Sequence, residues 1–487
     1  MPSLVWFRSD LRAGDHPALH HAATRGDGGV IGVFTACPQQ WLQHDWGFPR
    51  VDFVLRNLAA LSRRLEQLNI PLRYAECPTF REVPGVLLTL ARRHRCTDLF
   101  FNDEYEVNER RRDESVAACF AAAGLGVHRF AEQTIFPPGD IRTGQGGFFT
   151  VFTPYRRAWL RHLQEAGSLT NALPAPRRRP RLLCHPSRIP QTLRDFKPGA
   201  AQPATLASLW PAGETAAQKR LTAFVERRIA AYARSRDYPA IEGTSRLSPY
   251  LAAGVISVRS CLRAVQEAGD NEARSRPSGP DTWFNELIWR EFYRHVLVGF
   301  PRVSMGRAFR IETDRLEWSQ DPARFAAWCE GRTGFPIVDA AMRQLTRTGW
   351  MHNRLRMIVA MFLTKDLLLD WRLGERFFMR HLIDGDLASN NGGWQWAAST
   401  GTDAAPYFRI FNPLSQSRRF DPDGEFIRQY LPELRGLDNR SVHDPSRLPS
   451  EQRAAVDYPD PICDHAASRV EIIRRFRALR HRPAGPG

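Results

Sequence analysis

The spacing of apolar residues changes once along the chain, and this change restricts the possible folds more than any other sequence feature. Up to about residue 130, short apolar runs typical of β-strands alternate with longer segments whose apolar residues recur at helical spacing. The strand-like runs are residues 4–7, 29–35, 71–75, 98–102 and 127–130, and residues 51–68 form one helical segment. This alternation predicts an α/β domain with a doubly wound parallel sheet.

The rest of the chain has a different pattern. After about residue 216 helical spacing dominates, and eight of the 13 tryptophans lie there, so we expect a large all-helical domain with tryptophans in its core. Residues 174–203 contain seven prolines and several arginines, and they lack helical spacing, which is typical of an interdomain connector. With 487 residues, the chain is long enough for two or three domains.

The chain is strongly basic. It has 68 Lys and Arg residues against 52 Asp and Glu residues, which gives a formal net charge of +16. A polyanion such as nucleic acid is therefore the leading partner, through phosphate contacts and counterion release. The alternative is a general bias toward arginine, since the only lysines are Lys197, Lys219 and Lys365.

Several classes of protein are disfavoured by simple features. The eight cysteines form no C-x-x-C pair or Cys/His cluster, which disfavours a zinc module or a disulfide framework and favours a reducing cytoplasm. The apolar run at 358–363 is too short for a membrane span, and the first residues do not resemble an export signal. No glycine-rich phosphate loop follows the first strand-like run, which argues against a dehydrogenase-type dinucleotide site.

A cluster of hydroxyl groups stands at 242–250. Thr244, Ser245 and Ser248 follow Gly243 at the start of a helical run. Exposed amides and hydroxyls at a helix N-terminus suit a phosphate or pyrophosphate. An ordinary N-cap turn is the alternative, and the segment alone does not decide between the two.

The helical segment 281–300 has an unusually polar face. Glu286, Trp289, Arg290 and Tyr293 are spaced i, i+3, i+4 and i+7, so they share one side of the helix. Such a row could hold a planar, hydrogen-bonding ligand such as a base. A solvated face with a Glu286–Arg290 ion pair is the alternative.

Two further strings have the composition of a ligand site. In 350–357 the residues Trp350, Asn353, Arg354 and Met357 fall on one helical side. In 384–396, two acids, two amides and two indoles surround glycines that permit unusual backbone angles. No His or Cys stands near these acids at a usable spacing, so we expect no metal.

Together these strings resemble the photolyase and cryptochrome family, most closely the class I cyclobutane pyrimidine dimer photolyases. The match runs from residues 5–8 to 458–459, and its most specific stretches are 283–293, 349–357 and 384–407. The resemblance implies an α/β antenna domain at 1–132, a connector at 133–215, a helical domain that binds FAD and DNA at 216–475, and a basic tail at 476–487.

The resemblance also implies site residues. Those expected to contact FAD are Tyr232, Thr244, Ser245, Arg246, Leu247, Ser248, Trp283, Arg290, Arg356, Asp384, Gly385, Asp386 and Asn390. An ion pair between Arg356 and Asp384 is expected, and Asn390 matches the residue near the reactive nitrogen of the flavin. The pocket for the flipped dimer and its DNA is expected to involve Arg236, Glu286, Trp289, Tyr293, Asn353, Arg354, Met357, Trp396 and Gln416.

The implied reaction is light-driven repair. Excited, fully reduced flavin donates an electron to a cyclobutane dimer, the two linking bonds split, and the electron returns. Trp394, Trp371 and Trp318 match the family's electron relay for flavin photoreduction, although without the resemblance they are interpreted as core residues, because spacing cannot show their separation. Damaged bases pair poorly, so flipping them out of the duplex costs less than flipping intact ones.

The antenna is implied less specifically. His44, Asn108 and Glu109 match family members that bind 5,10-methenyltetrahydrofolate, but the lysine those members often use is replaced here by Ser304-Met305-Gly306-Arg307. A deazaflavin or an empty antenna site are the alternatives.

The sequence also bears on three other functions. Asn353 and Met357 stand where (6-4) photolyases carry histidines, which disfavours repair of that lesion. Asn390 and the short C-terminal end, which we expect to be a helix with a basic face, disfavour a cryptochrome-like photoreceptor. A flavin-free nucleic-acid-binding module leaves the 384–396 cluster unexplained. The resemblance further implies a bacterial, cytoplasmic monomer with UV-damaged DNA as partner, no membrane association and no obligate protein partner.

Overall fold

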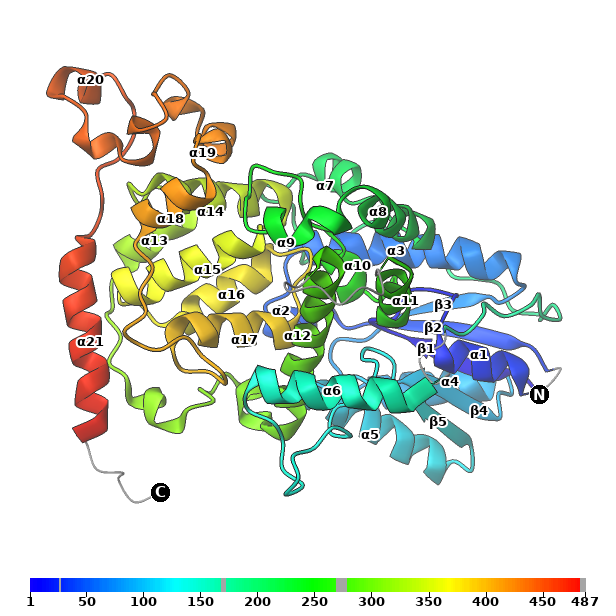
Figure 1. Ribbon diagram of the computed structural model, residues 1–487. Helices are drawn as coiled ribbons and strands as arrows, with labels where there is room; N and C mark the ends of the chain where they lie inside the picture. The colour runs from blue at the N-terminus through cyan, green and yellow to red at the C-terminus, as the bar shows by residue number, and fades with distance from the viewer. Residues whose placement is uncertain (26–27, 168–171, 269–277, 482–487) are drawn as a thin grey trace.

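The N-terminal part of the protein is built on a five-stranded parallel sheet. The computed structural model describes residues 1–25, 28–167, 172–268 and 278–481 (Figure 1). The strands stand in the order β3-β2-β1-β4-β5, and their bounds are β1 Ser3–Phe7, β2 Val30–Ala36, β3 Leu72–Glu76, β4 Asp98–Asn102 and β5 Gly126–Phe130. The predicted strands are therefore confirmed, with ends that differ by at most one residue.

Burial explains why these runs form strands. Every residue of β1 and β2 is buried, as expected for central strands of a parallel sheet covered on both faces. The helices of this part are α1 Pro17–Thr24, α2 Pro38–Gln43, α3 Phe48–Gln67, α4 Val83–Arg93 and α5 Val107–Ala122. The direction of the strand order reverses between β1 and β4, so right-handed crossovers place the helices of the two halves on opposite faces.

The connector is mostly irregular but contains two helices. These are α6 Phe152–Ala166 and α7 Pro203–Leu209. The proline-rich stretch between them runs along the edge of the sheet, where the amide of Ser187 donates to the carbonyl of Leu72 at 2.8 Å. The side chain of Arg73 also donates to the carbonyl of His185, at 2.7 Å. Backbone contacts of this kind hold a segment that has no helical spacing of its own.

The second part is all-helical in the described ranges, as predicted (Figure 1). Its helices are α8 Glu214–Arg227, α9 Tyr232–Ser235, α10 Ser248–Ala252, α11 Val258–Ala268, α12 Gly279–Gly299, α13 Pro322–Glu330, α14 Pro336–Thr348, α15 Asn353–Met361, α16 Trp371–His381, α17 Leu387–Ala398, α18 Pro413–Phe420, α19 Glu425–Tyr430, α20 Ser450–Ala454 and α21 His465–His481. A π-helical turn, Phe362–Asp366, follows α15.

Two features organise this part. The long helix α12 packs against α6, α9, α11 and α17, so it joins the connector to the helical core. The last helix, α21, stands at the edge of the molecule far from the sheet (Figure 1). It confirms that the arginine-rich end is helical through His481, although residues 482–487 of the predicted tail lie outside the described ranges.

Two negative findings concern the described ranges only. No helix there combines the length and apolar composition needed to cross a bilayer. Nor do three or more His, Cys, Asp or Glu side chains in those ranges come together in a way that could hold a metal ion.

The two adjacent glycines of α17 provide a test of the packing. A Cβ atom at Gly392 would overlap the ring of Tyr293 on α12, whereas one at Gly393 would meet no atom of the described chain within 4 Å. We expect Gly392→Ala to cost about 1–3 kcal/mol through overpacking and to lower the thermal unfolding midpoint. Gly393→Ala, the control, should leave the midpoint unchanged or raise it, because alanine favours a helix interior by about 1 kcal/mol. Equal midpoints for the two variants would contradict the close approach of α17 and α12.

Candidate active site

The polar face of α12 does not form the internal ion pair that its spacing allowed. Glu286 pairs with Arg236, which follows α9, and Arg290 instead donates to the carbonyls of Gln133 and Leu251. Burial raises the pKa of Glu286, and Arg236 opposes this rise. The alternative of a Glu286–Arg290 pair is therefore wrong, because tertiary partners outcompete the neighbour one turn away.

Aromatic contacts fix the middle of this face. Trp289 stacks on Phe152 of α6 with ring centroids 3.7 Å apart and an angle of 7° between the planes. Tyr293 lies beside Trp289, with a centroid separation of 5.6 Å. The indole is thus held from one side by the connector helix and has little freedom to turn.

The string 350–357 adopts a different local structure from the one expected. The helix α15 begins at Asn353, and His352 is its N-cap, with Nδ1 accepting from the amide of Arg354 at 3.2 Å. Trp350 therefore precedes the helix and does not share a helical face with Met357, contrary to the prediction. Its indole nitrogen donates to Ser248 Oγ at 3.3 Å, which joins this string to the 242–250 segment.

A second ion pair lies beside the pair of Arg236 with Glu286. Arg354 Nη2 is 2.8 Å from Asp237 Oδ1, next in sequence to Arg236. The dipeptide Arg236-Asp237 thus contacts Glu286 of α12 with one residue and Arg354 of α15 with the other. Residues that are far apart in sequence, and that were predicted to receive the flipped dimer, therefore meet at one rim.

The acids of 384–390 have separate partners. Arg356 Nη2 lies 2.8 Å from Asp384 Oδ2, which confirms the predicted ion pair. Asp386 caps the N-terminus of α17 and pairs with Arg294, so its carboxylate faces the boundary between the two parts of the molecule. The side-chain nitrogen of Asn390 donates to the carbonyl of Glu375 on α16 at 3.0 Å, which fixes the orientation of the amide.

The segment 242–250 is a turn and not a capped helix start. The short helix α10 begins at Ser248, and its N-cap is Leu247, which has no side chain able to cap. Arg246 has a φ of +50°, an unusual value for a residue with a side chain. The ordinary N-cap alternative is thus wrong, and the hydroxyls of Thr244 and Ser245 precede the helix without capping it.

Buried hydrogen-bond donors gather around this turn. Arg246 Nε, Arg354 Nε and His352 Nε2 are buried without a hydrogen-bond partner among the described residues. Burial lowers the pKa of His352 to about 4, so its ring is neutral near pH 7. Since Nδ1 accepts from a backbone amide, Nε2 carries the proton and is a donor.

These donors fit a ligand that is rich in acceptors. Arg246, Arg354 and Arg356 all act electrostatically on His352, which places them close together. Buried donors normally find partners, so the unpaired ones indicate a missing acceptor. Phosphate oxygens and the carbonyl groups of a flavin are such acceptors, so the chemistry of this donor cluster fits FAD. Tyr232 and Trp283, the aromatic residues expected to contact FAD, are both buried.

The three relay tryptophans differ in burial. Trp394 and Trp371 are buried, whereas Trp318 is half-buried. A Cβ atom at Gly374, three residues after Trp371 on α16, would overlap the indole of Trp394, so this indole packs closely on the helix that carries Trp371. Of the three tryptophans, Trp318 is therefore the one nearest the surface.

One tryptophan near the relay was not singled out from the sequence. Trp328 on α13 is fully buried, and its ring centroid lies 6.0 Å from that of Trp394. Its indole nitrogen donates to the carbonyl of Val359. Sequence spacing has no signal for this contact, because residues 328 and 394 lie on different helices.

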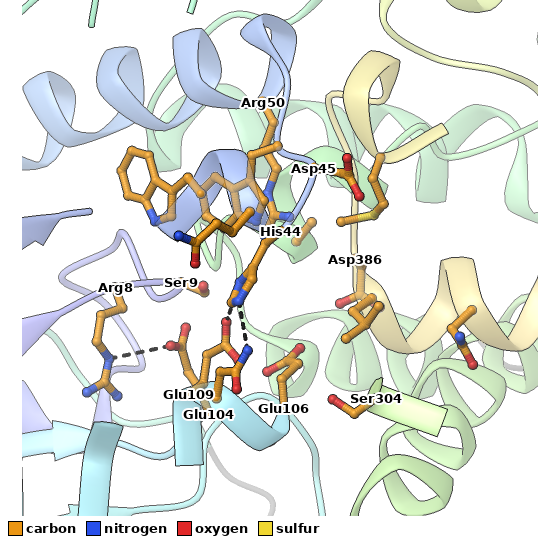
Figure 2. Close-up of a pocket in the computed structure, with 18 of the residues that line it drawn as sticks. Arg8, Ser9, His44, Asp45, Arg50, Glu104, Glu106, Glu109, Ser304 and Asp386 are labelled. Atoms are coloured by element: carbon orange, nitrogen blue, oxygen red, sulfur yellow. Dashed lines mark hydrogen bonds and ion pairs between the residues drawn. The ribbon is translucent and has the colours of Figure 1, made fainter. Parts of the chain in front are cut away.

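Apart from this donor cluster, a cavity of about 370 Å³ lies between the sheet and the helical part. It opens at the carboxyl ends of β1 and β4, where the strand order reverses, which is the usual ligand position in such sheets. Figure 2 shows Glu104, Glu106 and Glu109 gathered near His44 in this cavity. His44 Nδ1 lies 3.3 Å from Glu109 Oε1, and His44 Nε2 lies 3.0 Å from Asn108 Nδ2. The three predicted antenna residues therefore meet.

Other residues of this cavity were not predicted. Arg8 is buried under Trp6, with its guanidinium carbon 3.9 Å from the ring centroid, and its three nitrogens make no hydrogen bond within the described chain. Burial, together with Glu109 and Glu104, raises the pKa of Glu106 to about 8. Ser304 lines the wall where the family's lysine was expected. The sequence feature that could have identified Arg8 as a cavity residue is its position directly after a predicted strand.

Glu106 and Glu104, on the wall of this cavity, should affect the pH dependence of stability in opposite directions. Glu106 keeps its proton in the folded protein up to about pH 8 but has an ordinary pKa near 4.3 when unfolded. Stability is therefore lost as pH rises through this window. Glu106→Gln should make the unfolding midpoint less dependent on pH between 5 and 8. Each kcal/mol of free energy of unfolding corresponds to a midpoint shift of roughly 2 °C.

Glu104 is the matched control on the same cavity wall. Burial tends to raise its pKa, but Arg112 and Arg8 outweigh burial and lower it. Glu104→Gln should therefore lower the unfolding midpoint at pH 7, because it removes one of the two carboxylates, Glu104 and Asp113, that each lie 2.7 Å from Arg112. A Glu106→Gln variant with an unchanged pH profile would refute a protonated Glu106.

Comparisons with known proteins agree with this geometry. A family model described as DNA photolyase matches residues 3–177, and one described as the FAD binding domain of DNA photolyase matches residues 283–478. The chain is 44% identical over 482 residues to a deoxyribodipyrimidine photo-lyase of Salmonella typhimurium, covering 99% of each sequence.

Solved structures show the same similarity. A bacterial class III photolyase from Agrobacterium tumefaciens superposes with a TM-score of 0.88 at 34% identity, covering 99% of this chain and 98% of that one. A cryptochrome from Synechocystis superposes with a TM-score of 0.85 at 27% identity, covering 97% and 99%. With full-length relatives at this identity and a matching two-part fold, the chain belongs to the DNA photolyase family.

Proposed function

We propose that this protein repairs cyclobutane pyrimidine dimers in DNA with the energy of light, as a deoxyribodipyrimidine photolyase. The observation that carries the proposal is the rim formed by Arg236-Asp237, Glu286 and Arg354 beside the donor-rich pocket. It combines a base-reading face with a pocket suited to FAD. Bound reduced FAD would supply the excited electron that splits the dimer, so the protein needs no nucleophile of its own.

The residues of the rim have distinct tasks in this proposal. Glu286 accepts hydrogen bonds from the flipped base, and Trp289, held by Phe152, packs against it. Asn353 is exposed and Met357 half-buried, which leaves both side chains accessible to a flipped base in this proposal. Neither side chain can act as the acid that a histidine would supply, which supports dimers and not (6-4) lesions as substrate.

In this proposal, FAD is bound by groups that have been described above. The Thr244–Ser248 turn and Arg246 hold the phosphates, the Arg356–Asp384 pair and Asn390 face the ring system, and Tyr232 and Trp283 exclude water. The amide of Asn390 is preorganised by Glu375. Trp318, Trp371 and Trp394 deliver electrons to the flavin in this proposal, which is supported by the burial of Trp394 and Trp371 and the partial exposure of Trp318.

The cavity of about 370 Å³ is proposed to hold an antenna chromophore, 5,10-methenyltetrahydrofolate. The proposal is supported by the contact of His44 with both Asn108 and Glu109, and by the acidic wall that a pterin's amino groups would hydrogen-bond. A deazaflavin is the second candidate, since the guanidinium of Arg8, which lies 3.5 Å from Asp113 but makes no hydrogen bond in the described chain, suits a ligand rich in carbonyl oxygens. The absorption spectrum of freshly purified protein distinguishes these chromophores and an empty cavity.

Glu286 provides the test of repair. With chemically reduced enzyme and dimer-containing DNA, Glu286→Ala should bind the substrate roughly ten- to a hundredfold more weakly, because it loses a hydrogen bond to a charged group worth about 1.5–3 kcal/mol. Repair per absorbed photon should fall as well, while flavin content stays unchanged. Glu286→Gln keeps the shape of the side chain and one acceptor. Its substrate affinity and its repair per absorbed photon should therefore lie between those of wild type and Glu286→Ala. Wild-type protein that holds flavin but leaves dimers intact under light would instead indicate a photoreceptor.

The relay has its own matched control. Trp371→Phe should block the photoreduction of oxidised flavin in the presence of a thiol, while leaving repair by chemically reduced enzyme intact. Trp328→Phe removes an equally buried indole next to Trp394 and should leave photoreduction in place. If Trp328→Phe also blocks photoreduction, the electron route passes through α13 and the proposed order is wrong.

A further inference from the structure

The last helix of the chain covers the outermost tryptophan of the proposed relay. Helix α21 and the segment before α13 share a small apolar cluster at the edge of the molecule. Its buried members are Leu316, Leu368, Ile472, Phe476 and Leu479, and Trp318, Tyr407 and Ile410 pack against it. Figure 1 shows α21 at this edge of the molecule, where it packs against residues 311–315 and 362–366.

One side chain of α21 contacts the backbone and side chain on both sides of Trp318. Arg475 Nη1 donates to the carbonyl of Glu317 at 2.7 Å, and Arg475 Nη2 donates to Ser319 Oγ at 3.3 Å. Its third nitrogen, Nε, donates to Glu471 Oε1 at 2.8 Å, which orients the guanidinium from within the helix. A rigid, planar fork suits this three-way contact, and a lysine could not reproduce it.

The opposite side of the same segment is tied to the region of Trp371. The amide of Ser319 donates to the carbonyl of Leu368 at 2.8 Å, three residues before Trp371. Trp318 therefore sits between Arg475 on one side and the residues that lead into α16 on the other. Its distance to Trp371 depends on both contacts.

The helix that carries Arg475 is itself anchored to the π-helical turn Phe362–Asp366. His465 Nδ1 lies 2.5 Å from the buried carboxylate of Asp366, at the start of α21. Further along, the ammonium of Lys365 lies 4.3 Å from the ring centroid of Phe476. These two contacts fix α21 along its length, so the position of Arg475 is determined by the core and not by solvent.

We propose that Arg475 is a positioning residue for Trp318 and sets the efficiency of the outer electron-transfer step. The proposal rests on the relay proposed above. In that step oxidised Trp371 takes one electron from Trp318, and Trp318 is oxidised in turn. The indole of Trp318 then releases its proton to water, and an added thiol returns the electron and the proton.

Arg474 provides a control on the same helix. It also pairs with Glu471, at 2.7 Å, but its side chain is 68% exposed against 20% for Arg475. Arg474→Ala and Arg475→Ala therefore remove one positive charge each from the same turn, and only the second releases the segment around Trp318. Arg475→Lys keeps the charge and loses the fork.

The experiment uses flavin-loaded protein and a thiol donor. Arg475→Ala should photoreduce its flavin between roughly three- and thirty-fold more slowly, the loss that a displacement of about 1 Å or less causes in a geometry-dependent step. Arg475→Lys should lose a similar amount, and Arg474→Ala should match wild type. Repair by chemically reduced enzyme should be unchanged in all three.

Two further measurements report on position and not on turnover. Hydrogen exchange at the amide of Ser319 should speed up in Arg475→Ala but not in Arg474→Ala. The transient absorption of the outer tryptophan radical should have a smaller yield in the same variant. Wild-type photoreduction in Arg475→Ala overturns the proposal, as does full activity of Arg475→Lys, which would show that charge alone matters. If Trp318→Phe itself photoreduces normally, the relay fails and this proposal fails with it.

Discussion

The close packing of α17 against two neighbouring helices is the constraint on which the chemistry depends. The ring of Tyr293 on α12 occupies the space that a side chain at Gly392 would need, and the indole of Trp394 rests on Gly374 of α16. Both ends of α17 carry charges that suit its dipole. Asp386 caps its N-terminus, and Lys365 donates to Ala398 O and Ser399 Oγ at its C-terminus. Asn390, Trp394 and Trp396 are thereby held in fixed positions relative to one another.

Charge compensation is the second constraint around the pocket. Arg236 with Glu286, Arg354 with Asp237, and Arg356 with Asp384 form three ion pairs at or near one rim. Pairing limits the cost of removing these groups from water. In the proposed function, a flipped base that approaches Glu286 would compete with Arg236 for the carboxylate, and a DNA phosphate would be an alternative partner for Arg236. Binding at this rim would then exchange an ion pair within the protein for contacts with the ligand.

The cavity beside His44 lies at the boundary between the sheet and the helices. Arg294 and Asp386, which line it, belong to α12 and α17, the helices that also carry Glu286 and Asn390. A ligand in this cavity would therefore be linked through these two helices to the residues proposed to bind FAD. This arrangement follows from the way α12 joins the two parts of the chain.

Much of the architecture could be predicted from the sequence, because local spacing reports local structure. Strand ranges, the helical part and the shared face of Glu286, Trp289 and Tyr293 depend on periods of two and 3.6 residues. Family resemblance added the pair of Arg356 with Asp384, which spacing could not show.

Only the tertiary structure decided which partner each group takes. Glu286 pairs with Arg236 and not with Arg290 one turn away, and Trp350 lies outside α15. Trp328 lies beside Trp394, and Arg475 contacts the segment that contains Trp318. Each of these contacts joins residues from different elements. The distance between such residues is set by how helices pack, and no periodicity within a single segment carries that information.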